Sequence, residues 1–302
     1  MTARSVSMGA PFRWLMKALD VGRRQPGALF GGFALLLLVA LVPSVLQLAG
    51  QRLFAAAPAA LLTVYAVSVV LSLVLVPPLL GSAFRLLHAC ESGQPASATD
   101  IFHGYRDLGF GLRMLLTMLL AAAVYVLLFG LLFVALPGRE FFAELIVRAA
   151  ATPPGGQPDM SGMPPFPPGF LLWLLGAMLG VLVLTNAYML AFARAALNRQ
   201  GPVAALLDGL RATLKNLLPF LLIAIVVAIV GFIALMIFAL VVGLVFGLLA
   251  AVSLGLALVV AVPIYLALML VLYVVMFGYY YNAWHDLFGE PVLLEPSDAL
   301  VA

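Results

Sequence analysis

The longest uncharged run in the chain extends from Leu217 to Trp284 and contains no Asp, Glu, Lys or Arg. Roughly 20 apolar residues cross the hydrocarbon core of a bilayer, so a run of this length must fold back at least once. Small residues and Ser253 cluster around Ala250–Gly255, where we expect the turn. Only 9% of all residues are charged and the mean hydropathy is +1.20, values that a soluble domain does not reach. The sequence therefore predicts a polytopic α-helical membrane protein.

Short segments with helical periodicity precede the apolar runs. The segment "VAALLDGLRATLKNLL" repeats its leucines at i, i+3 and i+4, opposite a face with Asp208, Arg211 and Lys215. Similar patterns occur in "PFRWLMKALDVGRRQP", with Phe12, Leu15, Met16 and Leu19 on the apolar face, and in "SATDIFHGYRDLGFGLR". Each contains a Gly-x-Arg, at Gly22, Gly104 and Gly209. These patterns predict amphipathic helices that lie in the membrane interface.

Glycine followed by proline ends three apolar helices. The pairs are Gly93/Pro95, Gly201/Pro202 and Gly289/Pro291, and we expect left-handed glycines there. Together the patterns predict an all-α integral membrane fold with six transmembrane helices in three hairpin repeats, each introduced by an amphipathic interfacial helix. The repeats cover about 11–95, about 99–202 with an extracytoplasmic loop over 137–169, and about 203–291, followed by a cytoplasmic tail over 292–302. "REFFAELIVRAA" predicts a short helix within the loop.

Basic residues are distributed unequally between the two sides of these spans. Twelve fall on one side, while only Arg52, Arg139 and Arg148 fall on the other. The positive-inside rule makes the first side cytoplasmic, with both termini inside. We expect an N-terminus that is not cleaved as a signal peptide.

Two groups of residues are candidate sites. Interfacial basic side chains are expected to contact lipid headgroups or a partner protein: Arg13, Lys17, Arg23, Arg24, Arg106, Arg211 and Lys215. A second, intramembrane polar site would use Asn186, Thr185, Pro77 and Pro78, because prolines break span helices at transporter binding sites. Interhelical hydrogen bonding and plain packing are the alternative explanation for these four residues.

The sequence offers little catalytic chemistry. No HExxH, P-loop, GxSxG or nucleotide fingerprint occurs, and His285-Asp286 has no accompanying nucleophile motif. Cys90 is the single cysteine, and His88 beside it is a poor two-ligand metal site. We expect no enzyme activity, cofactor, metal or nucleic-acid partner.

The stretches "RWLMKALDVGRRQPGALF" and "ESGQP", with the threefold layout, resemble uncharacterised bacterial inner-membrane proteins with six spans. That family is similar in pattern to the membrane domain of some glycerophosphodiester phosphodiesterases. The catalytic domain of those enzymes has no counterpart here, so the resemblance implies a bacterial inner-membrane location and no hydrolase activity.

Two functions follow as expectations. The first is a non-enzymatic inner-membrane scaffold, anchor or regulator that holds a partner at the cytoplasmic face. The alternative is a transporter of a lipid or hydrophobic small molecule, since no ionisable residue lies near the middle of any span.

Overall fold

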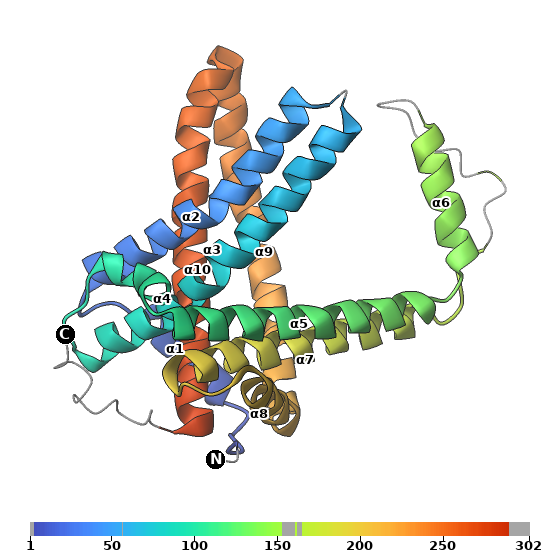
Figure 1. Cartoon of the computed structure of the whole chain (residues 1–302). Helices are drawn as coiled ribbons and strands as arrows, with labels where there is room; N and C mark the ends of the chain where they lie inside the picture. Colours follow the sequence, from blue (N-terminus) through green and yellow to red (C-terminus); the bar gives the residue numbers. More distant parts are fainter. Residues whose placement is uncertain (1–2, 56, 153–160, 162–164, 290–302) are drawn as a thin grey trace. The chain divides into compact units, whose positions relative to one another are not determined.

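The computed structural model describes residues 3–55, 57–152, 161 and 165–289. Within these residues the chain is helical and contains no strand (Figure 1). The elements, in order, are α1 (Ala10–Leu19), α2 (Pro26–Leu53), α3 (Pro58–Ser92), the 3-10 helix η1 (Ala98–Phe102), α4 (His103–Arg106), α5 (Leu108–Val134), α6 (Arg139–Ala151), α7 (Phe170–Leu197), α8 (Pro202–Lys215), α9 (Leu217–Val252) and α10 (Leu254–Phe288).

Six of the described helices are long and apolar enough to cross a membrane: α2, α3, α5, α7, α9 and α10. This confirms the expected number of helices that could span a membrane. The uncharged run folds back once at Ser253, whose extended backbone separates α9 from α10. Its hydroxyl accepts a hydrogen bond from the Leu256 amide at 3.5 Å and caps the second helix. The six helices fit a multi-pass membrane protein.

The described chain forms two compact units. One contains Met1–Leu120 and Asn186–Ala302, and the other contains Ala121–Thr185. In the smaller unit the far parts of α5 and α7 run side by side (Figure 1). The Tyr125 and Thr185 hydroxyls lie 2.8 Å apart, and the Trp173 indole donates to the Leu132 carbonyl at 3.0 Å. The helix expected near the start of the 137–169 loop is present as α6.

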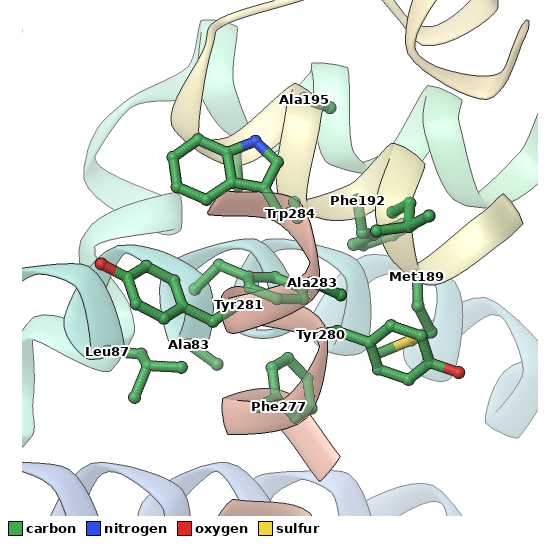
Figure 2. Packing of buried hydrophobic residues seen from close by; sticks show 14 of the residues in the cluster. Ala83, Leu87, Met189, Phe192, Ala195, Phe277, Tyr280, Tyr281, Ala283 and Trp284 are labelled. Atoms are coloured by element: carbon green, nitrogen blue, oxygen red, sulfur yellow. The ribbon is translucent and has the colours of Figure 1, made fainter. Parts of the chain in front are cut away.

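The larger unit has its core at one end of the spans. The buried residues of α3 and α10 concentrate near the C-termini of these helices, and those of α9 near its N-terminus. Phe277, Tyr281 and Trp284 of α10 lie between Leu87 of α3 and Phe192 of α7 (Figure 2). Most other span residues are exposed, as lipid-facing residues are. Aromatic packing therefore holds these helices at this end, which we call the packed end.

Two of the three expected glycine stops are confirmed by a positive φ. Gly93 has φ +76° at the C-terminus of α3, and Gly289 has φ +80° after α10. The expectation for Gly201 is wrong, because its φ is −65° and its ψ is 153°. A residue before proline avoids the helical region, and Pro202 begins α8 directly. The turn after α7 instead places Arg199 in the left-handed region, with φ +52°. Pro291 and the tail over 292–302 lie outside the described residues.

Candidate interfacial platform

Four short elements lie at the packed end of the larger unit. We call α1, η1, α4 and α8, with the segment 3–9 before α1, the basal platform. The seven basic residues expected to contact headgroups or a partner all belong to the platform or its linkers, and all seven are exposed. Arg23 pairs with Asp20 at 2.7 Å and Arg24 donates to the Glu91 carbonyl at 2.7 Å, but no ion pair is present for Arg13, Lys17 or Arg106 among the described residues. Contact of these seven residues with headgroups or a partner stays a prediction.

Helix α1 is attached to α10 through a single tryptophan. The Trp14 side chain is fully buried, and its ring centroid lies 5.8 Å from the ring of Phe220. Its indole N–H donates to the Asp286 carboxylate at 2.7 Å. Close approach of the two helices uses Gly278, where a Cβ would lie 3.2 Å from Ala18.

The buried face of α1 differs from the expected one. We expected Phe12, Leu15, Met16 and Leu19 to form it, but Met16 and Leu19 are 64% and 59% exposed. The protein-facing side consists of Ala10, Trp14 and Ala18 instead. Small residues let two helices approach closely, so the larger apolar side chains remain on the outer surface.

The segment before α1 is held by the junction between α8 and α9. The Asn216 side chain accepts from the Val6 amide at 2.9 Å and donates to the Arg4 carbonyl at 3.1 Å. The Lys215 ammonium donates to the Ala3 carbonyl at 2.8 Å, and the Arg4 amide donates to the Leu287 carbonyl at 2.9 Å. These bonds connect the segment to both ends of the last hairpin.

The second short element, η1–α4, packs on α3. Its capping box joins Ser97 and Asp100, and the Gly104 amide donates to the buried Ser82 hydroxyl at 2.9 Å. A Cβ on Gly104 would lie 2.7 Å from the Pro78 carbonyl, so only glycine fits this approach. The Tyr105 hydroxyl donates to the Leu75 carbonyl, and burial raises the pKa of Tyr105 to about 12.

Helix α8 contains the three charged residues expected on one helix face, Asp208, Arg211 and Lys215. Its buried face consists of the small residues Ala205, Gly209 and Ala212, whereas Val203 and Leu214 are exposed. Gly209 lies directly against the Ala187 carbonyl of α7, where a Cβ would overlap the oxygen. The leucines were expected on the apolar face of an interfacial helix, and that expectation stays a prediction. They remain free to contact lipid.

Asp208 is not a solvated charge, contrary to expectation. Its Oδ2 accepts from Arg194 at 2.9 Å and from Gln200 at 2.8 Å, and its side chain is only 17% exposed. Burial alone would raise the pKa of Asp208, but the hydrogen bonds from Gln200 and Arg194 hold it below the ordinary value. Arg211 lies 3.8 Å from the other carboxylate oxygen and is 74% exposed, as expected of an interfacial cation.

The four intramembrane candidates do not form one described site. Asn186 is buried and accepts from the Tyr280 hydroxyl at 3.3 Å, while Thr185 belongs to the smaller unit. Pro77 and Pro78 are buried inside α3, and Pro78 lies against Gly104 of the platform. Asn186 and the prolines therefore make the interhelical contacts of packed helices.

Sequence reasoning missed the residues that hold the platform in place. Asp286 and Asn216 join elements distant in sequence, and Arg194 joins α7 to α8. Arg194 is 6% exposed, although the sequence had counted it only as one basic residue on the cytoplasmic side. The sequence did contain a signal for the role of Arg194, because this residue directly follows an apolar span. A charged side chain there needs a partner if the end of the helix is packed against protein.

The remaining titratable residues also have structural contacts. His88 Nδ1 lies 3.0 Å from the Tyr281 hydroxyl, and Cys90 is buried. Asp286 receives the Trp14 indole and lies 3.9 Å from His285. No group of three or more His, Cys, Asp or Glu side chains that could hold a metal ion occurs among the residues with described positions.

Comparison with known proteins gives no relative: no family model, no curated protein and no solved structure matches the chain. The geometry at the packed end is therefore the basis for the functional argument.

Proposed function

We propose that the chain is a non-enzymatic scaffold or anchor of the bacterial inner membrane, with the basal platform at the cytoplasmic face. Six apolar helices and the excess of basic residues at the packed end support this placement. We also propose that the platform elements are amphipathic interfacial helices that introduce three hairpin repeats. Membership of the six-span family stays a prediction from the quoted motifs.

Close packing of the short elements on the spans supports the repeat. Gly104 lies against Pro78 of α3, and Gly209 against Ala187 of α7. In the remaining pair the glycine is in the span, where Gly278 of α10 receives Ala18 of α1. Each short element would therefore pack on the return span of the preceding hairpin, with α1 packing on the last one.

The observation that carries the scaffold proposal is the fixed position of the exposed basic residues. Trp14, Asn216 and Asp208 bind α1, the segment 3–9 and α8 to the ends of the spans. A buried core rich in aromatic side chains, part of which Figure 2 shows, lies at the same end of these helices. A surface held by so many independent contacts loses little conformational entropy when a partner binds, which favours a docking role.

Affinity purification of the full chain in mild detergent after in-cell crosslinking tests this proposal. A specific partner should be recovered with the native chain and lost from the variant Arg13→Glu/Lys17→Glu, in which two exposed charges of α1 are reversed. The matched control is Arg52→Glu, at an exposed position near the opposite end of α2. A native chain recovered without any stoichiometric protein would contradict the scaffold function.

A second candidate function, transport or binding of a hydrophobic molecule, is favoured by two apolar grooves. One, of about 260 Å³, lies between α9 and α10 and is lined by residues that include Phe238, Phe246 and Ala261. The other, of about 490 Å³, lies between α5 and α7 around Gly176 and Gly180. Reconstitution with fluorescent phospholipids would test it, since a carrier accelerates their movement between leaflets whereas a scaffold leaves the rate at that of empty vesicles.

A further inference from the structure

Arg85 contacts two elements that each carry another arginine: its guanidinium lies over Phe110, one turn before Arg113, and its Nε donates to the Ala196 carbonyl, three residues before Arg199. Arg85 belongs to α3, Arg113 to the first turns of α5, and Arg199 to the turn after α7. The charges of Arg113 and Arg199 both act on Arg85. Like charges from three elements are therefore gathered in one place, at an electrostatic cost to the fold.

Arg85 is positioned by its neighbours rather than left free. Its guanidinium carbon lies 3.7 Å from the centre of the Phe110 ring, and its Nε donates to the Ala196 carbonyl at 3.2 Å. The ring and the carbonyl fix the plane of the guanidinium. Its two terminal nitrogens remain available to another acceptor.

Arg113 has an unsatisfied donor beside this group. Its Nη1 is buried and has no hydrogen-bond partner among the described residues. A buried guanidinium nitrogen without an acceptor is costly, and such an atom is normally satisfied by a protein group, water or a bound anion. This independent observation indicates an acceptor that the chain itself does not supply.

The acids near these arginines do not balance the charge. Asp107 acts on Arg85, but its Oδ1 already accepts from the Phe110 amide at 2.9 Å, a bond that lowers its pKa below the ordinary value. Three arginines and one described carboxylate leave a net positive charge here, which suits an anion such as a phosphate group.

The depth of the arginines fits a lipid headgroup. Helix α3 has 35 residues and is therefore about 52 Å long, well beyond the ~30 Å hydrocarbon core. Arg85 lies about 10 Å of helix before Ser92 at the end of α3. Arg113 and Arg199 lie near the same end of the spans, at the start of α5 and after α7.

We propose that Arg85, Arg113 and Arg199 form a phosphate-binding site that takes the phosphate of an anionic lipid headgroup or a free phosphate. Arg113 supplies the buried donor, and the oriented guanidinium of Arg85 supplies its two terminal nitrogens. The exposed side chain of Arg199 closes the site from the aqueous side. The site depends only on insertion of the chain into a membrane. The proposal therefore applies whether the protein is a scaffold or a carrier.

The test measures lipid binding to the purified full-length chain in neutral detergent by native mass spectrometry. The probes are dioleoylphosphatidylglycerol, whose net charge is negative, and dioleoylphosphatidylcholine, whose phosphate is balanced by the choline cation. We expect phosphatidylglycerol to bind the native chain about tenfold more tightly, and Arg113→Gln or Arg199→Asn to weaken its binding about tenfold each. Arg52→Gln, at an exposed position at the other end of α2, should bind as the native chain does.

Arg199→Asn keeps the test decisive even where Arg113→Gln fails to fold. Arg199 is exposed, and asparagine accepts its left-handed backbone better than most residues do. Competition with inorganic phosphate separates the two sources: release of the lipid supports a site open to free phosphate, and retention supports a site selective for the headgroup. Equal binding of the two lipids, or equal phosphatidylglycerol binding by Arg199→Asn and Arg52→Gln, would overturn the proposal.

Discussion

The indole Nε1 of Trp14 donates a 2.7 Å hydrogen bond to Oδ2 of Asp286, although the two residues are 272 positions apart in the chain. One bond thus joins the first helix to the last. Since the Trp14 side chain is fully buried, no water can replace the carboxylate as its acceptor. The presence of this hydrogen bond therefore indicates whether α1 is packed against α10.

Replacing Trp14 by phenylalanine keeps an aromatic ring but removes the donor. We expect Trp14→Phe to lower the free energy of unfolding by about 1–3 kcal/mol, because it removes a hydrogen bond to a charged group. Thermal unfolding in detergent, followed by circular dichroism, measures the change. Combining it with Asp286→Ala should add little further loss, and full additivity of the two changes would argue against the bond.

Gly209→Ala should separate α8 from α7. The new Cβ would overlap the backbone oxygen of Ala187, and backbone cannot move aside as a flexible side chain can. We expect a destabilisation of about 1–3 kcal/mol, typical of overpacking. Gly231→Ala in α9 is the matched control, since nothing lies within 4 Å of that position, and it should be neutral or stabilising. Equal melting temperatures for the two variants would contradict this packing.

Acid should weaken the attachment of α8 through Asp208. The folded-state pKa of Asp208 is below its ordinary value of 3.8, so its stabilising contribution is present above that value and is lost as the pH falls through the folded pKa. Asp208→Asn should therefore lower the melting temperature near neutral pH and make it less sensitive to pH in the acid range. Asp20→Asn, at an exposed ion pair with Arg23, should leave the acid dependence nearly unchanged.

The proposed orientation predicts which positions a membrane-impermeant maleimide reaches. In a Cys90→Ser background, Arg52→Cys should react in intact spheroplasts, whereas Lys17→Cys should react only after permeabilisation. Both parent residues are exposed and Cys90 is buried, so access depends on the side of the membrane. Labelling of Lys17→Cys in intact spheroplasts would reverse the orientation.

The six long apolar helices and the turn at Ser253 were predictable. Bilayer thickness required at least one turn in the run from Leu217 to Trp284, and the threefold sequence pattern predicted the count of six. The exposed positions of Arg13, Lys17 and Arg211 were predictable as well, since long charged side chains need water. These properties depend on the solvent around each residue and can be read locally.

The buried faces of α1 and α8 were not predictable in the same way. Periodicity assigns Met16, Leu19 and Leu214 to an apolar face. It does not indicate whether that face contacts lipid or protein, because both environments are apolar. Small residues such as Ala18 and Gly209 determine the protein-facing side through close backbone approach. The partners of Asp208 and Asp286 depend on tertiary contacts that no local pattern contains.

The bonds of Asn216 to Arg4 and Val6 have a consequence for biogenesis. The segment 3–9 leaves the ribosome before any of the six long helices, yet its acceptors and donors lie at the start of α9 and, through Leu287, at the end of α10. Its docking must wait until the translocon has released the final hairpin. A segment synthesised before all six long helices is thus among the last to reach its native position, and it fastens the packed end after insertion.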